Sequence, residues 1–303
     1  MKNNKTLGNL LLIITAMIWG TAFAWQRVGM ESIEPITFTA ARMALAAVFV
    51  GIIAIIFDKK DKRNITRTQA EQKEYNKYSI IGGICCGLFL TFASLFQQIG
   101  VVYTTAGKAG FITAMYMLIV PIISFVLFKK KYPLFVWFAV LIGVLGMYLL
   151  CVSETFTLTK GDALILVCAF LFSGHILCCD YFVQKGSSIK ISAMQFLTTA
   201  VISAILAFIF ETPSVDKVIS ATVPILYCGI ISGGIGYTLQ IVAQKFTDPT
   251  VASLLMSLES VFAVIGGAFI LNEKMILRES IGCIIMFAAI ILVQLPHKKT
   301  RKG

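Results

Sequence analysis

Charged residues are scarce in this 303-residue sequence. They make up 14% of the chain, whereas hydrophobic residues make up 58%, and an average soluble domain is about one quarter charged. A water-soluble fold of this length cannot hide so much apolar surface, because a large share of any globular surface stays exposed. The same composition excludes a disordered chain, a coiled coil, a collagen-like chain and a secreted disulfide scaffold. An integral membrane protein remains.

Catalytic and metal-binding motifs are also missing. The chain has two histidines and neither an H-E-x-x-H nor a G-x-S-x-G sequence. The string nearest to a Walker A motif, residues 106–109, lacks the Ser or Thr and the preceding glycine spacing. His175 shares a helical face with Cys178 or Cys179, but no second cluster completes four metal ligands. We therefore expect no enzyme activity, no metal site, no cofactor and no hydrolysis of ATP by this chain.

Long apolar runs dominate what is present. A bilayer core about 30 Å thick needs about 20 apolar residues per helical span. Polar and apolar residues alternate along the strands of a transmembrane β-barrel. They do not alternate in these runs. All eight cysteines fall inside them and are expected to serve as small packing residues. We predict an all-α integral membrane protein with ten transmembrane helices, at 7–27, 35–57, 79–101, 106–128, 134–152, 161–183, 190–210, 219–243, 249–271 and 276–295.

The basic residues are distributed unevenly between alternate loops. With the N-terminus in the cytoplasm, 19 of the 26 Lys and Arg residues lie on the inner side and 6 on the outer side, while Arg42 lies within a span. The positive-inside rule then places both termini in the cytoplasm. We expect a multi-pass protein of the cell membrane, with basic loops near anionic lipid. No folded domain or interleaved aromatic residues accompany the basic runs, so nucleic acid is not an expected partner.

The chain also repeats itself weakly. Spans one and two match spans six and seven at an offset of 153 residues, spans three and four match eight and nine at 143, and span five matches span ten at 139. Each repeat, residues 1–153 and 154–303, holds five spans, so the second repeat enters the membrane upside down. Inverted repeats build transporters whose substrate binds near the midplane between them. Matched positions include Gly8 with Gly161, Arg42 with Gln195, Gln97 with Gln240, Tyr103 with Phe246, and Thr104 with Thr247.

Two polar segments lie outside the spans. Loop 58–78 is charged and cytoplasmic, and we expect a flexible connector or an amphipathic surface segment there. The second repeat is predicted to end in a basic cytoplasmic tail.

Several motifs resemble a known family. Trp19-Gly20 late in span one, Arg42 in span two, Pro121 in span four, and Leu258–Ala263 followed by Leu271-Asn272-Glu273-Lys274 in span nine are similar to the EamA family of the drug/metabolite transporter superfamily. The resemblance covers residues 7–295 and implies a ten-helix secondary carrier, often an exporter of amino acids or other metabolites. The family often has proline after the glutamate of span nine, where this chain has Ser260. We therefore expect any kink in that span elsewhere, at Gly266-Gly267.

Two pairs of matched polar positions lie within the predicted spans. Glu259 is eleventh of 23 residues in span nine, near mid-depth, where a carboxylate usually faces a cavity or a partner. It either binds a cation, a proton or a substrate amine, or anchors helices through hydrogen bonds. Its counterpart Tyr116 offers a phenol and a π-face, with plain packing as the alternative. Arg42 either pairs with Glu259 or a substrate carboxylate or extends to the headgroups, and its counterpart Gln195 falls toward the inner side.

Two further candidates complete the predicted central cavity. Trp19 lies too deep for an interfacial position, so it either shapes a pocket or packs between helices. His175 either relays protons or is a hydrogen-bonded packing residue. Lys108 is expected to extend toward the outer headgroups. We expect interfacial or helix-capping roles for four glutamines near span ends, namely Gln97, Gln98, Gln240 and Gln244.

Together these features predict a secondary active transporter. It would export small metabolites, such as amino acids or related amphipathic compounds, by alternating access, with a coupling proton as a candidate partner. The glycines of spans five, eight and ten are expected to pack helices within one chain, which suits a monomer or a weak homodimer. A facilitative channel or uniporter and a non-transporting scaffold are the alternatives, although the chain has no filter loop or rings of polar residues.

Overall fold

The chain folds into a bundle of helices, and no strand is present among the residues that the structure describes. The computed structural model describes residues 2–64, 67–104, 106–151, 159–270 and 276–294. The predicted repeat boundary at 153–154, the segment Leu271–Lys274 and the basic tail therefore lie outside the described residues. The elements are α1 (Lys2–Gly29), α2 (Pro35–Asn64), α3 (Gln69–Val102), α4 (Ala106–Ala114), α5 (Tyr116–Phe128), α6 (Leu134–Cys151), α7 (Lys160–Val183), α8 (Ser188–Phe210), α9 (Val215–Ser220), α10 (Thr222–Leu226), the π-helix η1 (Tyr227–Tyr237), α11 (Thr238–Gln244), α12 (Pro249–Met256), α13 (Glu259–Ile270) and α14 (Leu277–Gln294).

The apolar segments lie where the sequence predicts membrane spans. Eight helical segments of the described chain are long and apolar enough to cross a membrane, and Leu134–Leu149 and Ser280–Leu292 are shorter apolar helices at the positions of spans five and ten. Large apolar side chains cover the outside: Phe208 is 77% exposed and Phe269 84%. Such a surface would be unfavourable in water and suits contact with lipid. The all-α membrane fold is confirmed, and the count of ten spans stays a prediction.

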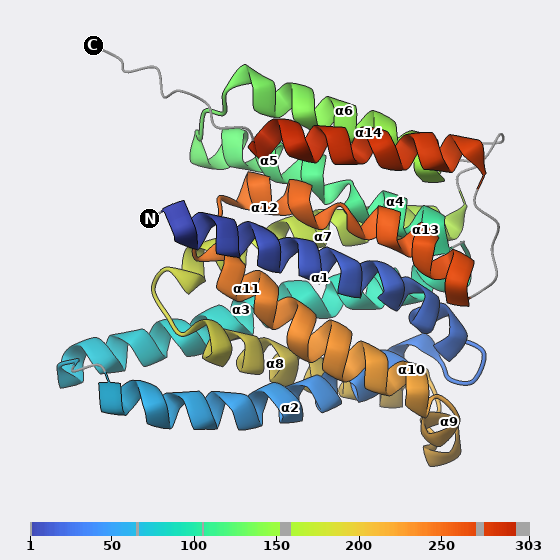
Figure 1. Ribbon diagram of the computed structural model, residues 1–303. Coiled ribbons are helices and arrows are strands. Elements are labelled where there is room, and N and C mark those ends of the chain that lie inside the picture. The colour runs from blue at the N-terminus through green and yellow to red at the C-terminus, as the bar shows by residue number, and fades with distance from the viewer. Residues whose placement is uncertain (1, 65–66, 105, 152–158, 271–275, 295–303) are drawn as a thin grey trace, which may run out of the picture.

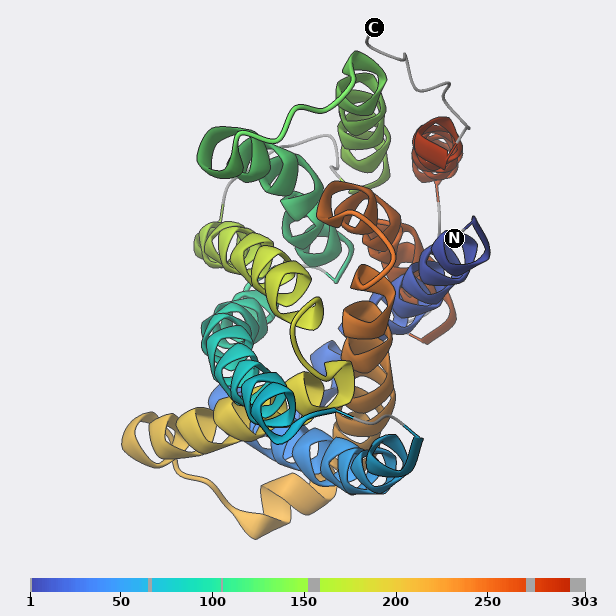
Figure 2. The ribbon, with the colours of Figure 1, turned by 90° about the vertical axis from the view of Figure 1, so that its left-hand side faces the viewer.

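The long helices run roughly side by side and alternate in direction (Figure 1). The start of α1 and the end of α14 lie at the same end of the bundle. Figure 2 shows α2 and α8 at one edge, α6 and α14 at the opposite edge, and the remaining long helices between them. α3 packs along α7 and α8, while η1 packs along α1 and α2. At the α6–α14 edge, Gly146 permits backbone contact, because a Cβ there would lie 2.9 Å from the carbonyl oxygen of Gly282.

Most of loop 58–78 is helical, so it is not a flexible connector, and the alternative of an amphipathic surface segment stays a prediction. α2 continues to Asn64, and α3 begins at Gln69, ten residues before the predicted span. A capping box starts α3: the backbone N–H of Thr68 donates to the Glu71 carboxylate at 2.8 Å, and the N–H of Glu71 donates to the Thr68 hydroxyl at 3.3 Å. This local signal, Thr-x-x-Glu before a long helix, is present in the sequence and was missed.

Polar contacts cap the N-terminus of α2. The backbone N–H groups of Ile36 and Thr37 donate to the Glu211 carboxylate at 2.9 and 2.7 Å, so a side chain from the end of α8 caps α2. Nearby, Glu34 pairs with Lys217. The hydrogen bond from this ammonium group lowers the pKa of the Glu34 carboxyl.

Candidate functional site

Two membrane-spanning segments each contain a short turn inside the bundle. Span four divides at Met115 into α4 and α5, and span nine divides at residues 257–258 into α12 and α13. The second half-helices begin with Tyr116 and Glu259, which the 143-residue offset matches to each other. Met115 and Ser257 keep right-handed helical dihedrals, so each interruption is a local distortion within a continuous apolar span; such distortions are often found at functional sites.

Serine hydroxyls lie at the turn in span nine. Ser257 Oγ donates to the carbonyl oxygen of Leu254 at 2.7 Å, and Ser260 Oγ donates to that of Ser257 at 2.8 Å. These side chains satisfy carbonyl groups at the interruption of the helix. The expectation of a kink at Gly266-Gly267 stays a prediction, since these glycines lie within the helix Glu259–Ile270. Gly266 packs against α1, where an added Cβ would lie 3.2 Å from the Thr21 Cα.

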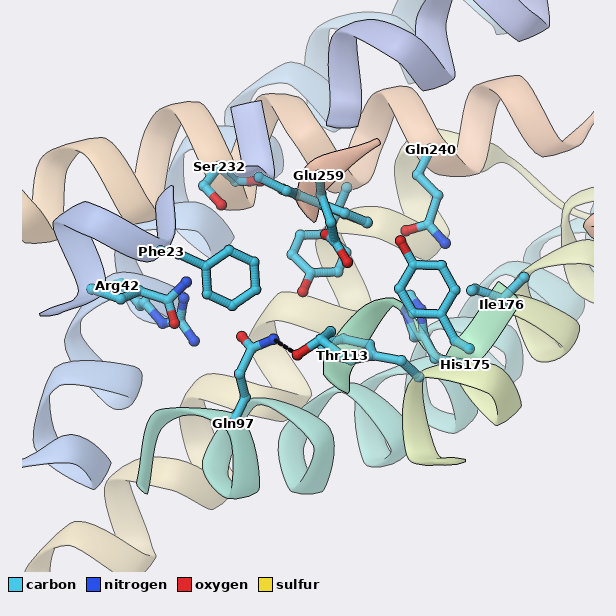
Figure 3. Close-up of a pocket in the computed structure, with 14 residues that line it drawn as sticks. Phe23, Arg42, Gln97, Thr113, His175, Ile176, Ser232, Gln240 and Glu259 are labelled. Carbon is cyan, nitrogen blue, oxygen red and sulfur yellow. Dashed lines mark hydrogen bonds between the residues drawn. The ribbon is translucent and has the colours of Figure 1, made fainter. Parts of the chain in front are cut away.

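The two turns border a cavity that is enclosed by both halves of the chain. Figure 3 shows its side chains converging from α1, α2, α3, α4, α5, α7, η1, α11 and α13. The space open to the centre of a water-sized sphere is about 20 Å³, which is room for little more than one water molecule. A metabolite can therefore enter only after helices or side chains move. The lining residues are Trp19, Phe23, Gln26, Arg42, Gln97, Thr113, Tyr116, Phe172, His175, Ile176, Ser232, Tyr237, Gln240 and Glu259.

Five of the six predicted site residues line this cavity. They are Trp19, Arg42, Tyr116, His175 and Glu259, and each is at most 9% exposed. The sixth, Gln195, lies behind the lining, where its Oε1 is 2.9 Å from His175 Nε2. Gln195 thus orients the imidazole from α8 and does not itself line the cavity.

Aromatic rings form one wall of the cavity. The Tyr237 ring from η1 lies 4.5 Å from Trp19, 5.9 Å from His175 and 6.5 Å from Phe172, measured between centroids. Trp19 Nε1 donates to the carbonyl oxygen of Ser232 at 3.2 Å. These rings present an apolar surface that can contact a ligand of moderate size.

Polar groups on the remaining walls are incompletely satisfied. Arg42 Nε, Tyr116 Oη and Glu259 Oε1 are buried and have no hydrogen-bond partner among the described residues, as do Gln26 Oε1 and Gln240 Oε1. Leaving such groups unsatisfied costs about 1–3 kcal/mol each, and buried polar groups are nearly always paired in native proteins. Their convergence on one small cavity indicates a site that is completed by water or by a ligand.

The two charged side chains of the cavity are not joined to each other. No ion pair between Arg42 and Glu259 occurs in the described parts of the chain. Arg42 is 4% exposed and its guanidinium Cζ lies 5.7 Å from the centre of the Phe38 ring. It is held inside the bundle, so it does not extend to the headgroups.

The interpretation of the glutamines as interfacial residues was wrong, because all four are buried. Gln97 and Gln240 line the cavity, and Gln97 Nε2 donates to Thr113 Oγ1 at 3.2 Å, as the dashed line in Figure 3 marks. Gln98 is fully buried, and Gln244 Nε2 donates to the carbonyl oxygen of Ile176 at 3.0 Å. Position along a span did not reveal that these helix faces point inward.

Two further features were missed or misread. Tyr237 ends an eleven-residue π-helix, a wider helix that is common at functional sites. Its glycines allow neighbouring helices to approach closely, because a Cβ on Gly236 would lie 2.7 Å from Trp19 Nε1. This confirms the predicted packing role for that glycine.

Lys108 does not extend toward headgroups, because its Nζ lies 2.6 Å from Asp162 Oδ2.

The cysteine and histidine cluster packs tightly between α3 and α7. Cys86 Sγ lies 3.4 Å from Cys178 Sγ, and Cys179 Sγ lies 3.5 Å from His175 Nε2. Within the described ranges, no group of three or more His, Cys, Asp or Glu side chains is arranged to hold a metal ion.

Comparison with known proteins gives a consistent result along the whole chain. The model of the EamA-like transporter family matches residues 6–152 and again residues 159–295. An uncharacterized transporter of Archaeoglobus fulgidus is 26% identical over 96% of this chain and 87% of its own length. The uncharacterized transporter YoaV of Bacillus subtilis is 22% identical over 93% of this chain and 94% of its own. A solved crystal structure with 19% identity covers 95% of this chain and 96% of its own, with a TM-score of 0.75, which shows a shared fold.

Proposed function

The chain belongs to the EamA-like transporter family and is a multi-pass membrane transporter, and from this premise we propose that it is a secondary carrier working by alternating access. In this proposal the central cavity binds a small amphipathic metabolite and opens alternately to the two sides of the membrane. The chain performs no chemistry on its substrate. Cavity residues Trp19, Arg42, Tyr116, His175 and Glu259 bind the substrate, and Gln195 positions His175.

The observation that carries the proposal is the set of buried polar atoms without partners around the cavity. Arg42 Nε and Glu259 Oε1 belong to this set and carry opposite formal charges. A zwitterion such as an amino acid would supply a carboxylate for the first and an ammonium group for the second. The Trp19, Phe172 and Tyr237 rings would contact its apolar part.

Helix packing supports the two inverted repeats, 1–153 and 154–303. The contact of α3 with α7 pairs spans three and six, and the contact of α1 with η1 and α11 pairs spans eight and one. Exchanging the two repeats converts one pair into the other. The family model also matches each half of the chain separately. Two halves with equivalent packing can exchange roles at similar free energy, which is what alternating access requires.

The direction of transport and its coupling belong to the same proposal. The excess of basic residues on one side supports the proposal that both termini lie in the cytoplasm of a cell-membrane protein. We propose export driven by the substrate's own gradient or by a proton, with Glu259 as the proton-binding group. The carrier works as a monomer or a weak homodimer.

Ligand-induced stabilisation of the purified protein tests the site directly. Amino acids, their decarboxylated amines and their deaminated acids are the probes, and the thermal midpoint in detergent is measured with each. Stabilisation by the amino acid but by neither fragment supports recognition at both charged residues. Glu259→Gln, a change of similar shape, should abolish the shift, whereas the exposed Glu74→Gln should keep it. An undiminished shift in Glu259→Gln would remove Glu259 from the site.

Transport in proteoliposomes then separates a carrier from the alternatives. Saturable counterflow of the stabilising compound supports a carrier. Unsaturable conductance would indicate a channel, and the absence of any flux with intact binding would indicate a scaffold.

A further inference from the structure

A partly buried ion pair joins the two halves of the chain at the end where α4 and α7 begin. Lys108 Nζ lies 2.6 Å from Asp162 Oδ2, and the Asp162 side chain is fully buried. Thr104 Oγ1 donates to Asp162 Oδ1 at 2.9 Å. We call Thr104, Lys108 and Asp162 the ionic clasp. Hydrogen bonds with an ionised partner are about twice as strong as neutral ones.

The repeat offsets place a second contact at the opposite end. Asp162 corresponds to Asn9 at offset 153, and Thr104 corresponds to Thr247 at offset 143. These two residues also meet: Thr247 Oγ1 donates to Asn9 Oδ1 at 3.2 Å. We call Asn9 and Thr247 the neutral clasp. Val251 occupies the position of Lys108, so the cation has no counterpart there.

Glycines bring the backbones together beside both clasps. A Cβ on Gly161 would lie 2.7 Å from the carbonyl oxygen of Gly100. At the other end a Cβ on Gly8 would lie 2.6 Å from Thr247 Oγ1 and 3.1 Å from the carbonyl oxygen of Ala243. Gly8 matches Gly161, and Ala243 matches Gly100, at the same offsets. The two contacts therefore occupy equivalent positions in the two repeats, and each lies at one end of the interface between the halves of the chain.

We propose that the two clasps are the gates of the cavity and that their unequal strength makes the neutral-clasp end open more readily. The proposal rests on alternating access as the proposed function. Opening the ionic clasp breaks an ammonium–carboxylate contact and a hydroxyl–carboxylate bond, whereas opening the neutral clasp breaks one hydroxyl–amide bond. In the predicted orientation the neutral clasp faces the cytoplasm, so the unloaded carrier favours access from that side.

A second charged contact near the neutral clasp does not offset this difference. Lys130 Nζ lies 3.8 Å from Asp180 Oδ2 and 3.7 Å from Asp248 Oδ2, and the Lys130 side chain is 40% exposed. Long, exposed ion pairs contribute little to stability.

Hydrogen–deuterium exchange of the full-length protein in lipid nanodiscs, without substrate, measures the opening of each end. In the unmodified chain, amides at the start of α1 and the end of α11 should exchange faster than those at the start of α4 and α7. Lys108→Gln removes the cation and should accelerate exchange at the ionic-clasp end by roughly ten- to a hundredfold. Exchange at the distant neutral-clasp end should slow, because the two openings exclude each other.

A matched variant separates gating from local helix capping. The Thr159 backbone N–H donates to Asp162 Oδ2, and the Thr159 hydroxyl accepts from the Asp162 N–H. Thr159→Ala removes that hydroxyl and leaves the ion pair, so exchange at the neutral-clasp end should not change. An equal remote effect of Thr159→Ala, or no remote effect of Lys108→Gln, would overturn the proposal.

The reverse exchange of residues provides an independent test. Asn9→Asp with Val251→Lys moves the ionic clasp to the other end, and it should slow exchange there and accelerate it at the start of α4 and α7. If this variant does not fold, Lys108→Gln still decides the question. Because no substrate is used, a chain with normal counterflow but unaltered exchange would refute the gates alone. Switched exchange in a chain without counterflow would refute the proposed transport alone.

Discussion

Gly20 offers the sharpest test of how closely α1 must approach α13. A Cβ at this position would lie 2.5 Å from the carbonyl oxygen of Glu259 and 2.4 Å from the Cβ of Phe262. The carbonyl oxygen belongs to the backbone, so no rotamer change can relieve the contact. Gly20→Ala therefore forces α1 and α13 apart by about 1 Å to restore ordinary van der Waals contact.

This displacement has two expected consequences. Overpacking of a well-packed interior typically costs about 1–3 kcal/mol, which is larger than the gain of about 1 kcal/mol from replacing glycine by alanine in a helix. The thermal midpoint in detergent should therefore fall. Glu259 opens α13, so it should move with the helix and ligand-induced stabilisation should weaken more than the loss of folded protein explains.

Gly51→Ala is the matched control. Gly51 also lies within a helix, but nothing lies within 4 Å of an added Cβ. This variant should keep ligand binding and raise the thermal midpoint slightly, because alanine is the better helix former. If Gly20→Ala behaves like Gly51→Ala in both measurements, the close approach of α1 to Glu259 is not required and the reasoning fails.

The remaining predictions concern contacts outside the cavity. Glu211→Gln weakens the cap on the Ile36 and Thr37 N–H groups, and the free energy of unfolding should fall by about 1 kcal/mol, measured by thermal or denaturant unfolding in detergent. The pKa of Glu34 is lowered by its hydrogen bond with Lys217, so its stabilising contribution is present above the ordinary carboxyl pKa and is lost as the pH falls through the lowered one. Glu34→Gln should reduce the acid sensitivity of unfolding in that range, by at most about 1 kcal/mol because the pair is partly exposed; unchanged pH dependence would contradict this assignment.

The sequence by itself determined the location of the apolar segments. A helix in lipid must form its own backbone hydrogen bonds and needs about 20 apolar residues to cross the bilayer. Membrane spans can therefore be predicted without knowledge of how the helices pack. The same register arithmetic matched Tyr116 with Glu259, and both residues begin a half-helix in the structure. Most of the predicted site residues could be chosen because an ionisable or polar group deep in a span is costly unless it faces a cavity or a partner.

Only the tertiary structure decided which way each helix face points. Gln97 and Gln240 lie near the ends of their spans, and the sequence there is compatible with an interfacial position as well as with a buried one. The rotation of α3 and α11 about their axes turns both side chains toward the cavity. The turn at residues 257–258 of span nine, beside serines that bond to neighbouring carbonyls, was also visible only in the structure. Lys108 meets Asp162 across 54 residues of chain, and such a pairing depends on how two helices pack. The length of an apolar segment is a property of that segment alone. The direction of each helix face, the position of a turn within a helix and the partner of a charged side chain depend on the neighbouring helices.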